Sequence, residues 1–378
     1  MPIEQERREL REAIVAFCAR ESGTREQRDL LTDRGAHPHN EELYRRIADL
    51  GWVGVAISPE FGGGGAGLSE LCIVLEETAR GMLPVRGIGP TLIVAGAYER
   101  FGTEEQKKEI LGGICAGASE AIAMSEPGAG SDVGALQCRA ERRAGGFVIN
   151  GQKTWCSNAH FADHILLIAR TDTNAGKHGG LTMFNVPTDV DGLTIRGIDT
   201  MGGREVNDLF FTDCFLPESA VVGAVDQAWT QLMAGLNLER LILAAMLLGT
   251  GRRAFEDTLT YVKQREQFGQ PIGTFQALKH RIADLATELE CCRLLVADVA
   301  ATADAEPTRM LPREASMAKL KVTETAKRIA LEGMQMMGGY GYATEHDMER
   351  HVRATLVSTI FGGTSEIQRE IIAKTYGL

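Results

Sequence analysis

The hydrophobic period of this chain changes twice, and these changes constrain its fold more than any other feature. Apolar residues recur at helical spacing from residue 5 to about 118. Short β-rich runs then follow one another at intervals of roughly ten residues, as in an antiparallel domain. The helical period returns after Pro217. We therefore predict a mainly α chain with a central β domain.

Three domains follow from this pattern: an N-terminal α-helical domain over 1–118, a β domain over 119–224 and a helical bundle over 225–378. Asn40 is predicted to cap one N-terminal helix, and Thr103 with Gln106 forms a capping box for another. The pair Asn150-Gly151, between two β-type runs, predicts a two-residue hairpin turn. The bundle is predicted from four helices at about 226–263, 275–303, 312–337 and 366–376.

Charge and cysteine content narrow the function classes. The net charge is −11 and no basic run stands out, so a nucleic-acid role is not expected. The eight cysteines include no CxxC pair, which is typical of buried thiols in a reducing compartment. The start MPIEQERRELRE has no apolar core, and no apolar run approaches the roughly 20 residues of a membrane span. We expect a soluble, cytoplasmic protein without membrane insertion.

Glycine is in excess, with 43 residues of 378, and it is clustered. The densest cluster contains Gly62-x-Gly64-x-x-Gly67, which formally satisfies a dinucleotide-binding fingerprint. Pro59 intrudes, however, and no βαβ unit with a ribose-binding acid follows. A connector between helices is the better interpretation.

The other glycine clusters carry polar side chains. Ser125–Asp132 alternates glycines with hydroxyls after a β-type run, and Trp155-Cys156-Ser157 adds an aromatic face beside another hydroxyl. Two later clusters, at 335–342 and 360–366, flank the last helices. Taken singly, a plain turn or a helix end explains each of them. Taken together, they could line one flat cofactor.

Five segments, in this order and spacing, resemble the flavin-dependent acyl-CoA dehydrogenases: MSEPGAGSD, INGQKTWCSN, REQFGQPIGTFQ, QMMGGYGY and IFGGTSEIQRE. The resemblance covers essentially the whole chain. It implies an N-terminal α-helical domain, a middle β-barrel-like domain and a C-terminal four-helix bundle that assembles dimers into tetramers. It also implies FAD as cofactor, an acyl-CoA substrate, an electron-transfer flavoprotein as acceptor, and a place in fatty-acid β-oxidation.

The resemblance also assigns residues to the cofactor. Met124 and Ser125 are expected at the pyrimidine edge of the flavin, Ser131 beside the pyrophosphate and the substrate, and Trp155 and Ser157 against the ring and near N5. The remaining cofactor residues are Arg265, Phe268 and Gln276 from a neighbouring subunit, Gln335, Gly338 and Gly339 near the ADP half, and Thr364 and Glu366. Serine at 125 and 157, where relatives often have threonine, keeps the hydroxyl.

The catalytic base is the point at which the chain departs from many relatives. They carry a glutamate where this chain has Gly362. In the subset that resembles isovaleryl-CoA and long-chain dehydrogenases, the base lies instead on a long helix, in a motif matched by Asn237-Leu238-Glu239-Arg240. A helix-surface pair of Glu239 and Arg240 is the plainer interpretation of the local sequence. Glycine at 362 together with glutamate at 239 favours catalysis by Glu239.

The resemblance gives the substrate contacts as well. Asn237 and Arg240 are expected to orient the base or the CoA arm, with Ser131, Gly362 and Gly363 at the substrate. The Gly362 N–H, together with a ribityl hydroxyl of FAD, is expected to form the oxyanion hole.

The expected reaction is dehydrogenation of an acyl-CoA to a trans-2-enoyl-CoA. Alternatives are a flavin oxidase or monooxygenase on the same fold with a non-CoA substrate, a non-catalytic helical scaffold, and an NAD-dependent dehydrogenase. No metal site is expected, because the pair His160 and His164 lacks the glutamate of a zinc-binding HExxH motif.

Overall fold

The structure, a computed structural model, describes residues 2–378, and the chain divides into two compact units. Unit 1 comprises the N-terminal segment up to Leu31 together with Gly67–Leu83 and Glu239–Leu378. Unit 2 comprises Thr32–Ala66 and Pro84–Leu238. Each unit is therefore assembled from segments that are distant in sequence.

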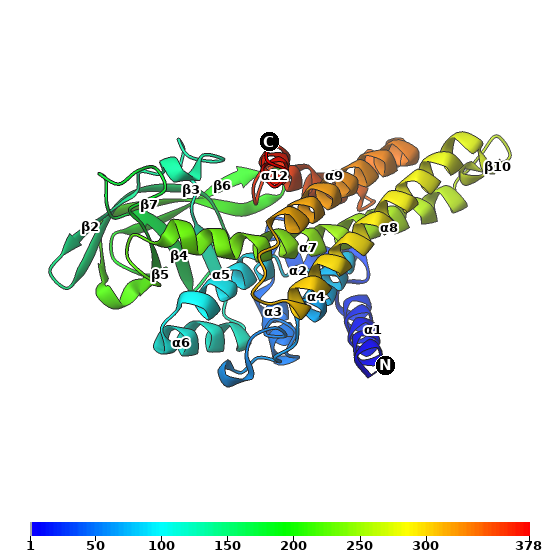
Figure 1. The fold of residues 1–378 in the computed structure, drawn as a ribbon. Coiled ribbons are helices and arrows are strands. Elements are labelled where there is room, and N and C mark those ends of the chain that lie inside the picture. The colour runs from blue at the N-terminus through cyan, green and yellow to red at the C-terminus, as the bar shows by residue number, and fades with distance from the viewer. Residues whose placement is uncertain (1) are drawn as a thin grey trace. The chain divides into compact units, whose positions relative to one another are not determined.

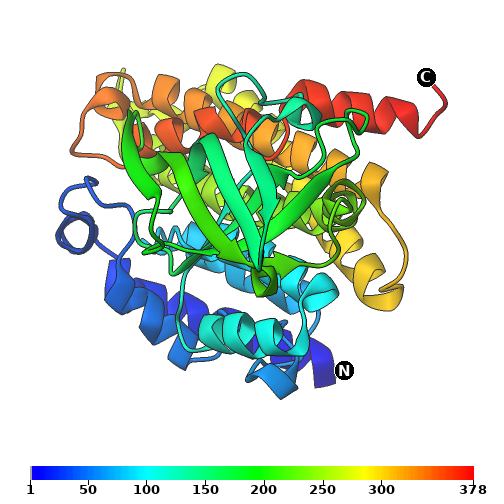
Figure 2. The same cartoon turned by 90° about the vertical axis from the view of Figure 1, so that its left-hand side faces the viewer.

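Unit 2 contains an eight-stranded sheet, which faces the viewer in Figure 2. The strand order is β6-β7-β3-β2-β4-β5-β8, and β1 pairs in parallel with β4. The strands are β1 (Glu120–Ala123), β2 (Arg139–Arg143), β3 (Gly146–Ser157), β4 (His164–Arg170), β5 (Leu181–Pro187), β6 (Leu193–Thr200), β7 (Gly203–Pro217) and β8 (Val221–Val222). The helices of the unit are α3 (Glu41–Asp49), α5 (Ile88–Phe101), α6 (Glu104–Cys115), and the 3-10 turns Pro59–Phe61, Val133–Ala135 and Glu218–Ala220.

Apolar side chains from one face of the strands form the core of this unit. Phe147, Ile149, Ile165 and Phe184 are all essentially inaccessible to solvent. Phe147 and Phe184 meet edge to face, with ring centroids 5.1 Å apart. The packing of these strands gives the loops at their ends a rigid support.

Unit 1 is helical, and the helices over 239–264, 276–305 and 312–337 run side by side in Figure 1. The helices of this unit are α1 (Pro2–Ser22), α2 (Arg25–Thr32), α4 (Leu68–Arg80), α7 (Ala228–Gln264, which begins in unit 2), α8 (Gln276–Ala305), α9 (Pro312–Met337), α10 (Gly339–Tyr342), α11 (Met348–Leu356) and α12 (Ser365–Lys374). A hairpin of β9 (Glu266–Gln267) and β10 (Gln270–Pro271) joins α7 to α8, and 3-10 turns cover Ile272–Thr274 and Val357–Thr359. Residues of α7, α8, α9 and α11 share one apolar core that includes Ala254, Leu285, Ile329 and Val352.

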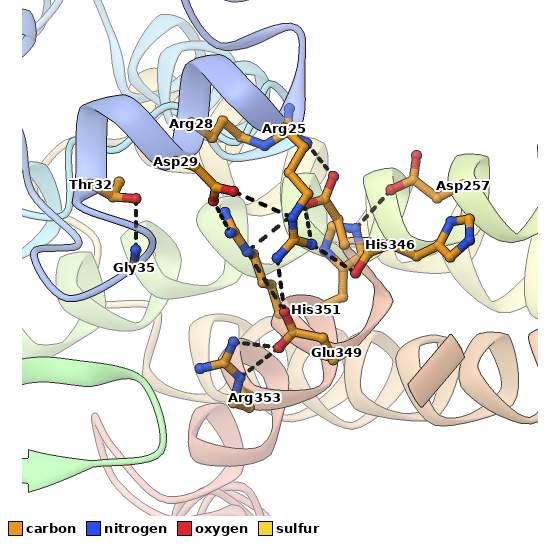
Figure 3. Close-up of polar contacts among 12 residues, drawn as sticks. Arg25, Arg28, Asp29, Thr32, Gly35, Asp257, His346, Glu349, His351 and Arg353 are labelled. Atoms are coloured by element: carbon orange, nitrogen blue, oxygen red, sulfur yellow. Dashed lines mark hydrogen bonds and ion pairs between the residues drawn. The ribbon is translucent and has the colours of Figure 1, made fainter. Parts of the chain in front are cut away.

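An ion-pair network ties α2 and α11 together within unit 1 (Figure 3). Arg25 and Arg28 of α2 both pair with Asp347, the residue before α11, and Arg350 pairs back with Asp29 of α2. Next to this network, His351 Nε2 lies 2.8 Å from Asp257 Oδ2 on α7. Partly buried pairs of this kind fix the position of short helices more firmly than exposed pairs do.

Among residues 2–378, one helix, α7, is long and apolar enough to cross a membrane by length and composition. About half of its most apolar window is buried inside the protein, and the core helix of a soluble protein passes the same test. The measure is weak evidence for a membrane span.

The predicted fold class is confirmed: helices precede a central sheet, and helices follow it. Both predicted caps are present, since Asn40 Oδ1 accepts from the Leu43 N–H at 2.9 Å and Thr103 and Gln106 form a capping box. The predicted turn at Asn150-Gly151 is wrong, because β3 continues through these residues with a register shift against β7. The hairpin turn lies before β3, at 144–145, between β2 and β3. Helix α11 was not predicted.

Candidate active site

The loop that follows β1 begins at Met124 and is anchored by a buried lysine of β3. Lys153 is fully buried, and its Nζ donates to the Met124 carbonyl at 3.0 Å and to Glu126 Oε1 at 2.7 Å. The Glu126 carboxylate also accepts from the backbone N–H groups of Gln137 and Cys138, at 2.6 and 2.8 Å. One buried cation and one carboxylate thus hold both ends of the segment that carries the expected flavin residues.

Burial lowers the pKa of Lys153, and the neighbouring Glu126 opposes this effect. An unpaired ammonium in this position would be costly, so its hydrogen bonds are necessary to the fold of the loop. The Thr154 N–H donates to the Ser125 carbonyl at 2.9 Å, which joins β3 to the same loop. Ser131, farther along the loop, is exposed and lies near its outer end.

A bulge in β3 presents the indole of Trp155. The register against β7 shifts between Lys153 and Cys156, and Trp155 adopts a left-handed backbone with φ 58°. A bulky residue rarely takes this conformation, and such strain is concentrated at functional sites. The Trp155 side chain is 60% exposed, whereas Cys156 beside it is buried. Ser157 follows, half-buried, at the end of the strand.

Glu239 in unit 1 lies opposite a glycine. A Cβ built on Gly362 would lie 3.5 Å from Glu239 Oε1 and 2.2 Å from Leu243 Cδ1. Gly362 and Gly363 both have positive φ, at 59° and 79°, which glycine adopts without strain. The carboxylate of Glu239 therefore points to the place where a side chain at position 362 would begin.

Two buried side chains hold the loop that contains these glycines. Lys319 Nζ donates to the carbonyls of Ser358 and Gly363, at 3.0 and 2.7 Å. Gln368 Nε2 donates to the carbonyls of Gly362 and Gly363, at 3.1 and 3.0 Å. Within residues 2–378, the N–H of Gly362 makes no hydrogen bond. This donor is available to a ligand.

The electrostatics around Glu239 combine burial with two cations. Burial raises the pKa of Glu239, and Arg240 and Lys319 act in the opposite direction. Burial lowers the pKa of Arg240, which Glu239 opposes. Burial also lowers the pKa of Lys319, to about 8. A half-buried carboxylate with a raised pKa is a stronger base than an exposed one.

One groove of about 660 Å³ in unit 1 is lined by several residues that are expected to serve the cofactor of a neighbouring subunit. Arg265, Phe268, Gly338 and Gly339 are among them. A Cβ added at either glycine would meet nothing within 4 Å, so the backbone there is open. The Arg265 guanidinium lies 5.6 Å from the centroid of the Tyr340 ring. Arginine beside open backbone is suited to a phosphate.

The remaining predicted residues lie elsewhere on the same unit. Thr364 and Glu366 line a second groove, of about 560 Å³, at the start of α12. The Thr364 hydroxyl caps that helix by accepting from the Ile367 N–H at 3.3 Å. Gln276 and Gln335 are exposed residues of α8 and α9 and line neither groove. Asn237 lies at the end of the unit 2 part of α7, two residues before Glu239.

Sequence reasoning missed the two buried lysines and Gln368. The burial of Lys319 could have been predicted from the sequence, because Lys319 lies on the apolar stripe of α9 together with Ala315, Val322 and Ala326. A lysine on such a stripe is rarely buried without a partner. Lys153 had no comparable signal, since its partners became known only once β3 was placed beside the Met124 loop.

Comparison with known proteins identifies the class of this chain as that of the FAD-dependent dehydrogenases. Family models match three successive parts of the chain, described as the N-terminal domain (4–118), the middle domain (121–214) and the C-terminal domain (226–377) of acyl-CoA dehydrogenase. The chain belongs to the acyl-CoA dehydrogenase family, and it is an oxidoreductase.

Individual relatives are similar over most of their length. A mitochondrial isovaleryl-CoA dehydrogenase of Solanum tuberosum is 36% identical over 348 residues, covering 89% of this chain and 82% of the relative. An acyl-CoA dehydrogenase structure from Geobacillus kaustophilus has a TM-score of 0.92 at 32% identity, covering 99% and 98% of the two chains. A glutaryl-CoA dehydrogenase from Mycobacterium smegmatis in complex with FADH2 has a TM-score of 0.88 at 26% identity, covering 98% and 94%.

Proposed function

We propose that this chain is an FAD-dependent acyl-CoA dehydrogenase with Glu239 as the catalytic base. The observation that carries the proposal is the position of the Glu239 carboxylate, 3.5 Å from where a Cβ of residue 362 would lie. A carboxylate that projects from α7 to this point needs a residue without a side chain at position 362, and that residue is glycine. The similarity to isovaleryl-CoA dehydrogenases supports an acyl-CoA as the substrate.

The residues present fit FAD. The exposed indole of Trp155 offers a flat apolar surface beside the hydroxyls of Ser125 and Ser157. Arg265 offers a permanent cation, and Gly338 and Gly339 offer backbone without side chains. Met124 and Ser125 are held by Lys153 and Thr154. When bound, FAD supplies the acceptor, at N5, for the hydride that leaves the substrate.

The protein residues perform the proton half of the reaction. The Glu239 carboxylate takes the proton from the carbon α to the thioester carbonyl, while the β hydrogen departs with its electron pair and the trans double bond forms. The Gly362 N–H donates to the thioester oxygen as negative charge develops on it. Arg240 and Asn237 orient the base or the CoA arm, and Ser131 and Gly363 contact the substrate.

The same proposal covers assembly and electron transfer. Arg265, Phe268 and Gln276, with Gln335, Gly338 and Gly339, serve the cofactor of a neighbouring subunit in a dimer of dimers. Thr364 and Glu366 complete the cofactor contacts. An electron-transfer flavoprotein would be the acceptor of the electrons removed from the substrate, and the reaction belongs to cytoplasmic fatty-acid β-oxidation.

The competing dinucleotide interpretation of Gly62–Gly67 is not supported by the structure. The N–H groups of Leu68 and Ser69 at the start of α4, which a pyrophosphate would need, donate to the Asp304 carboxylate at 2.6 and 3.0 Å. The helix terminus is already occupied by an anion of the protein.

The test is anaerobic bleaching of the flavin band by a panel of straight, branched and aromatic acyl-CoAs. We expect the wild type to bleach and Glu239→Gln to retain its flavin without bleaching, a loss of roughly a thousandfold or more in rate. Glu256→Gln, on the same helix but paired with Arg80, is the matched control and should bleach normally. Bleaching of Glu239→Gln at the wild-type rate would remove Glu239 from the role. Oxygen consumption without any acyl-CoA would indicate the oxidase or monooxygenase alternative.

A further inference from the structure

The buried cation of α9 has no role in the reaction as proposed above. Lys319 is completely inaccessible to solvent. A side chain that served only to join α9 to the following loop could be neutral, because the two acceptors it binds are carbonyls, those of Ser358 and Gly363. Burying an ammonium carries a large desolvation cost that an amide would avoid.

The first consequence of this lysine is geometric. Its two hydrogen bonds span the loop from Ser358 to Gly363, and the free N–H of Gly362 lies within that span. Gln368 binds the same carbonyl of Gly363 from α12. Carbonyls that precede and follow the Gly362 amide, those of Ser358 and Gly363, are therefore held in place before any ligand arrives, and an oxyanion donor requires such preorganisation.

The second consequence is electrostatic. The charged groups that act on Lys319 are Glu239 and Arg240 of α7, Glu324 of α9 and Glu366 of α12. Arg240 and Lys319 are the cations that act on Glu239, and each favours its carboxylate form. Arg240 adjoins Glu239 in the chain, whereas Lys319 acts on it from another helix, α9. Lys319 thus acts on the base and also binds the loop opposite the base.

We propose that Lys319 is a positioning residue of the dehydrogenation site, which holds the loop of the Gly362 amide toward the substrate and places a positive charge behind that loop, opposite Glu239. The proposal rests on the proposed role of Glu239 as the base. Its two parts are separable, because Gln368 also binds the Gly363 carbonyl but carries no charge.

Two substitutions divide these parts. Lys319→Gln removes the charge and keeps a donor, so the acid limb of the kcat profile should move to higher pH by about one unit. Gln368→Leu removes two loop hydrogen bonds and keeps the charge, so kcat should fall roughly tenfold or more with the acid limb unchanged. Lys321→Gln, two residues along α9 and paired with Glu288 at the surface, is the control and should leave both quantities unchanged.

A second readout does not depend on turnover. The carboxyl band of protonated Glu239, identified by its loss in Glu239→Gln, is followed by infrared difference spectroscopy of the substrate-free holoenzyme as the pH changes. The titration midpoint should rise in Lys319→Gln and stay at the wild-type value in Gln368→Leu. Failure of the wild type to bleach with any acyl-CoA would contradict the proposed function, while this titration would still test the effect of Lys319 on Glu239.

A Lys319→Gln protein that melts at a lower temperature but keeps the wild-type acid limb and infrared midpoint would overturn the proposal, because the lysine would then be purely structural. If Lys319→Gln does not fold, Lys319→Arg tests whether the two hydrogen bonds of Lys319 position the loop of Gly362. This variant keeps the positive charge but has a wider head group, so we expect an unchanged acid limb of the pH profile and a lower kcat. Wild-type kcat in Lys319→Arg would overturn that part.

Discussion

A methyl group at position 362 would have little room. The Cβ of Gly362→Ala would meet Leu243 Cδ1 at 2.2 Å and approach Glu239 Oε1, at a φ of 59° that alanine adopts only with strain. We expect a loss of about 1 kcal/mol in unfolding free energy from the backbone. Displacement of the base should also lower kcat roughly tenfold to a hundredfold. Thermal melts and steady-state kinetics measure the two effects.

The matched control is Gly145→Ala in the β2–β3 turn. Gly145 has φ 81°, and a Cβ there would meet nothing within 4 Å. This variant carries the same kind of backbone strain and should lose comparable stability while it keeps wild-type kcat. Equal kcat in Gly362→Ala and the wild type would show that Glu239 does not depend on the empty space at position 362.

The sequence allows site residues to be predicted, but it does not allow the environments of those residues to be predicted. The pairing of Gly362 with Glu239 followed from the family resemblance, and the structure adds the physical reason, a distance between two residues 123 positions apart in sequence. Trp155 was predicted, but its left-handed backbone was not, because the strain arises from the register shift of β3 against β7. Such contacts between distant segments leave no local pattern.

At the scale of elements, β1 carries a buried carboxyl that should make stability depend on pH. Burial raises the pKa of Glu120 to about 7, and His164 Nδ1 lies 3.3 Å from its Oε1. The hydrogen bond to Glu120 in turn raises the pKa of His164. Both groups bind protons more tightly in the folded state than in the unfolded state. Their stabilisation is therefore present at low pH and lost as the pH rises through about 7.

Glu120→Gln should remove most of this dependence. Between pH 6 and pH 8 we expect the wild type to lose about 1 to 3 kcal/mol relative to the variant. Melting temperatures across this range measure the difference. Glu109→Gln, an exposed carboxylate 3.8 Å from the other nitrogen of His164, is the control and should follow the wild type. If the melting temperatures of the wild type and of Glu120→Gln changed in parallel with pH, Glu120 would not be the source of the pH dependence.

The elements themselves were largely predictable, and the exceptions have a common cause. Caps such as Asn40 and Thr103 satisfy their own helix, so local sequence is sufficient to predict them. Asn150-Gly151 has the composition of a turn, but Asn150 pairs through its side chain with Asp213 of β7, and the strand continues. Helix α11 is short and is held by ion pairs to α2, which its own residues do not reveal.

At the scale of the whole molecule, the hairpin of β9 and β10 presents an aromatic ring that unit 1 does not bury. Phe268 is 94% exposed, and its ring meets that of Phe275 edge to face at 6.1 Å. Phe268 and Gly269 both have positive φ, the pattern of a type I′ turn, in which asparagine or glycine is preferred to phenylalanine. A strained, exposed aromatic side chain contributes little to the folded monomer.

Because this hairpin is expected to serve the cofactor of a neighbouring subunit, Phe268→Asp should weaken assembly and flavin binding together. We expect a smaller molar mass by light scattering, and several-fold less flavin per chain after gel filtration, since a ligand that bridges subunits is lost when they separate. Excess FAD should then restore part of the assembly by mass action. Leu30→Asp, which removes an equally exposed apolar side chain from α2, is the control and should keep both mass and flavin. A Phe268→Asp protein of wild-type mass that has lost its flavin would place Phe268 against the cofactor of its own subunit instead.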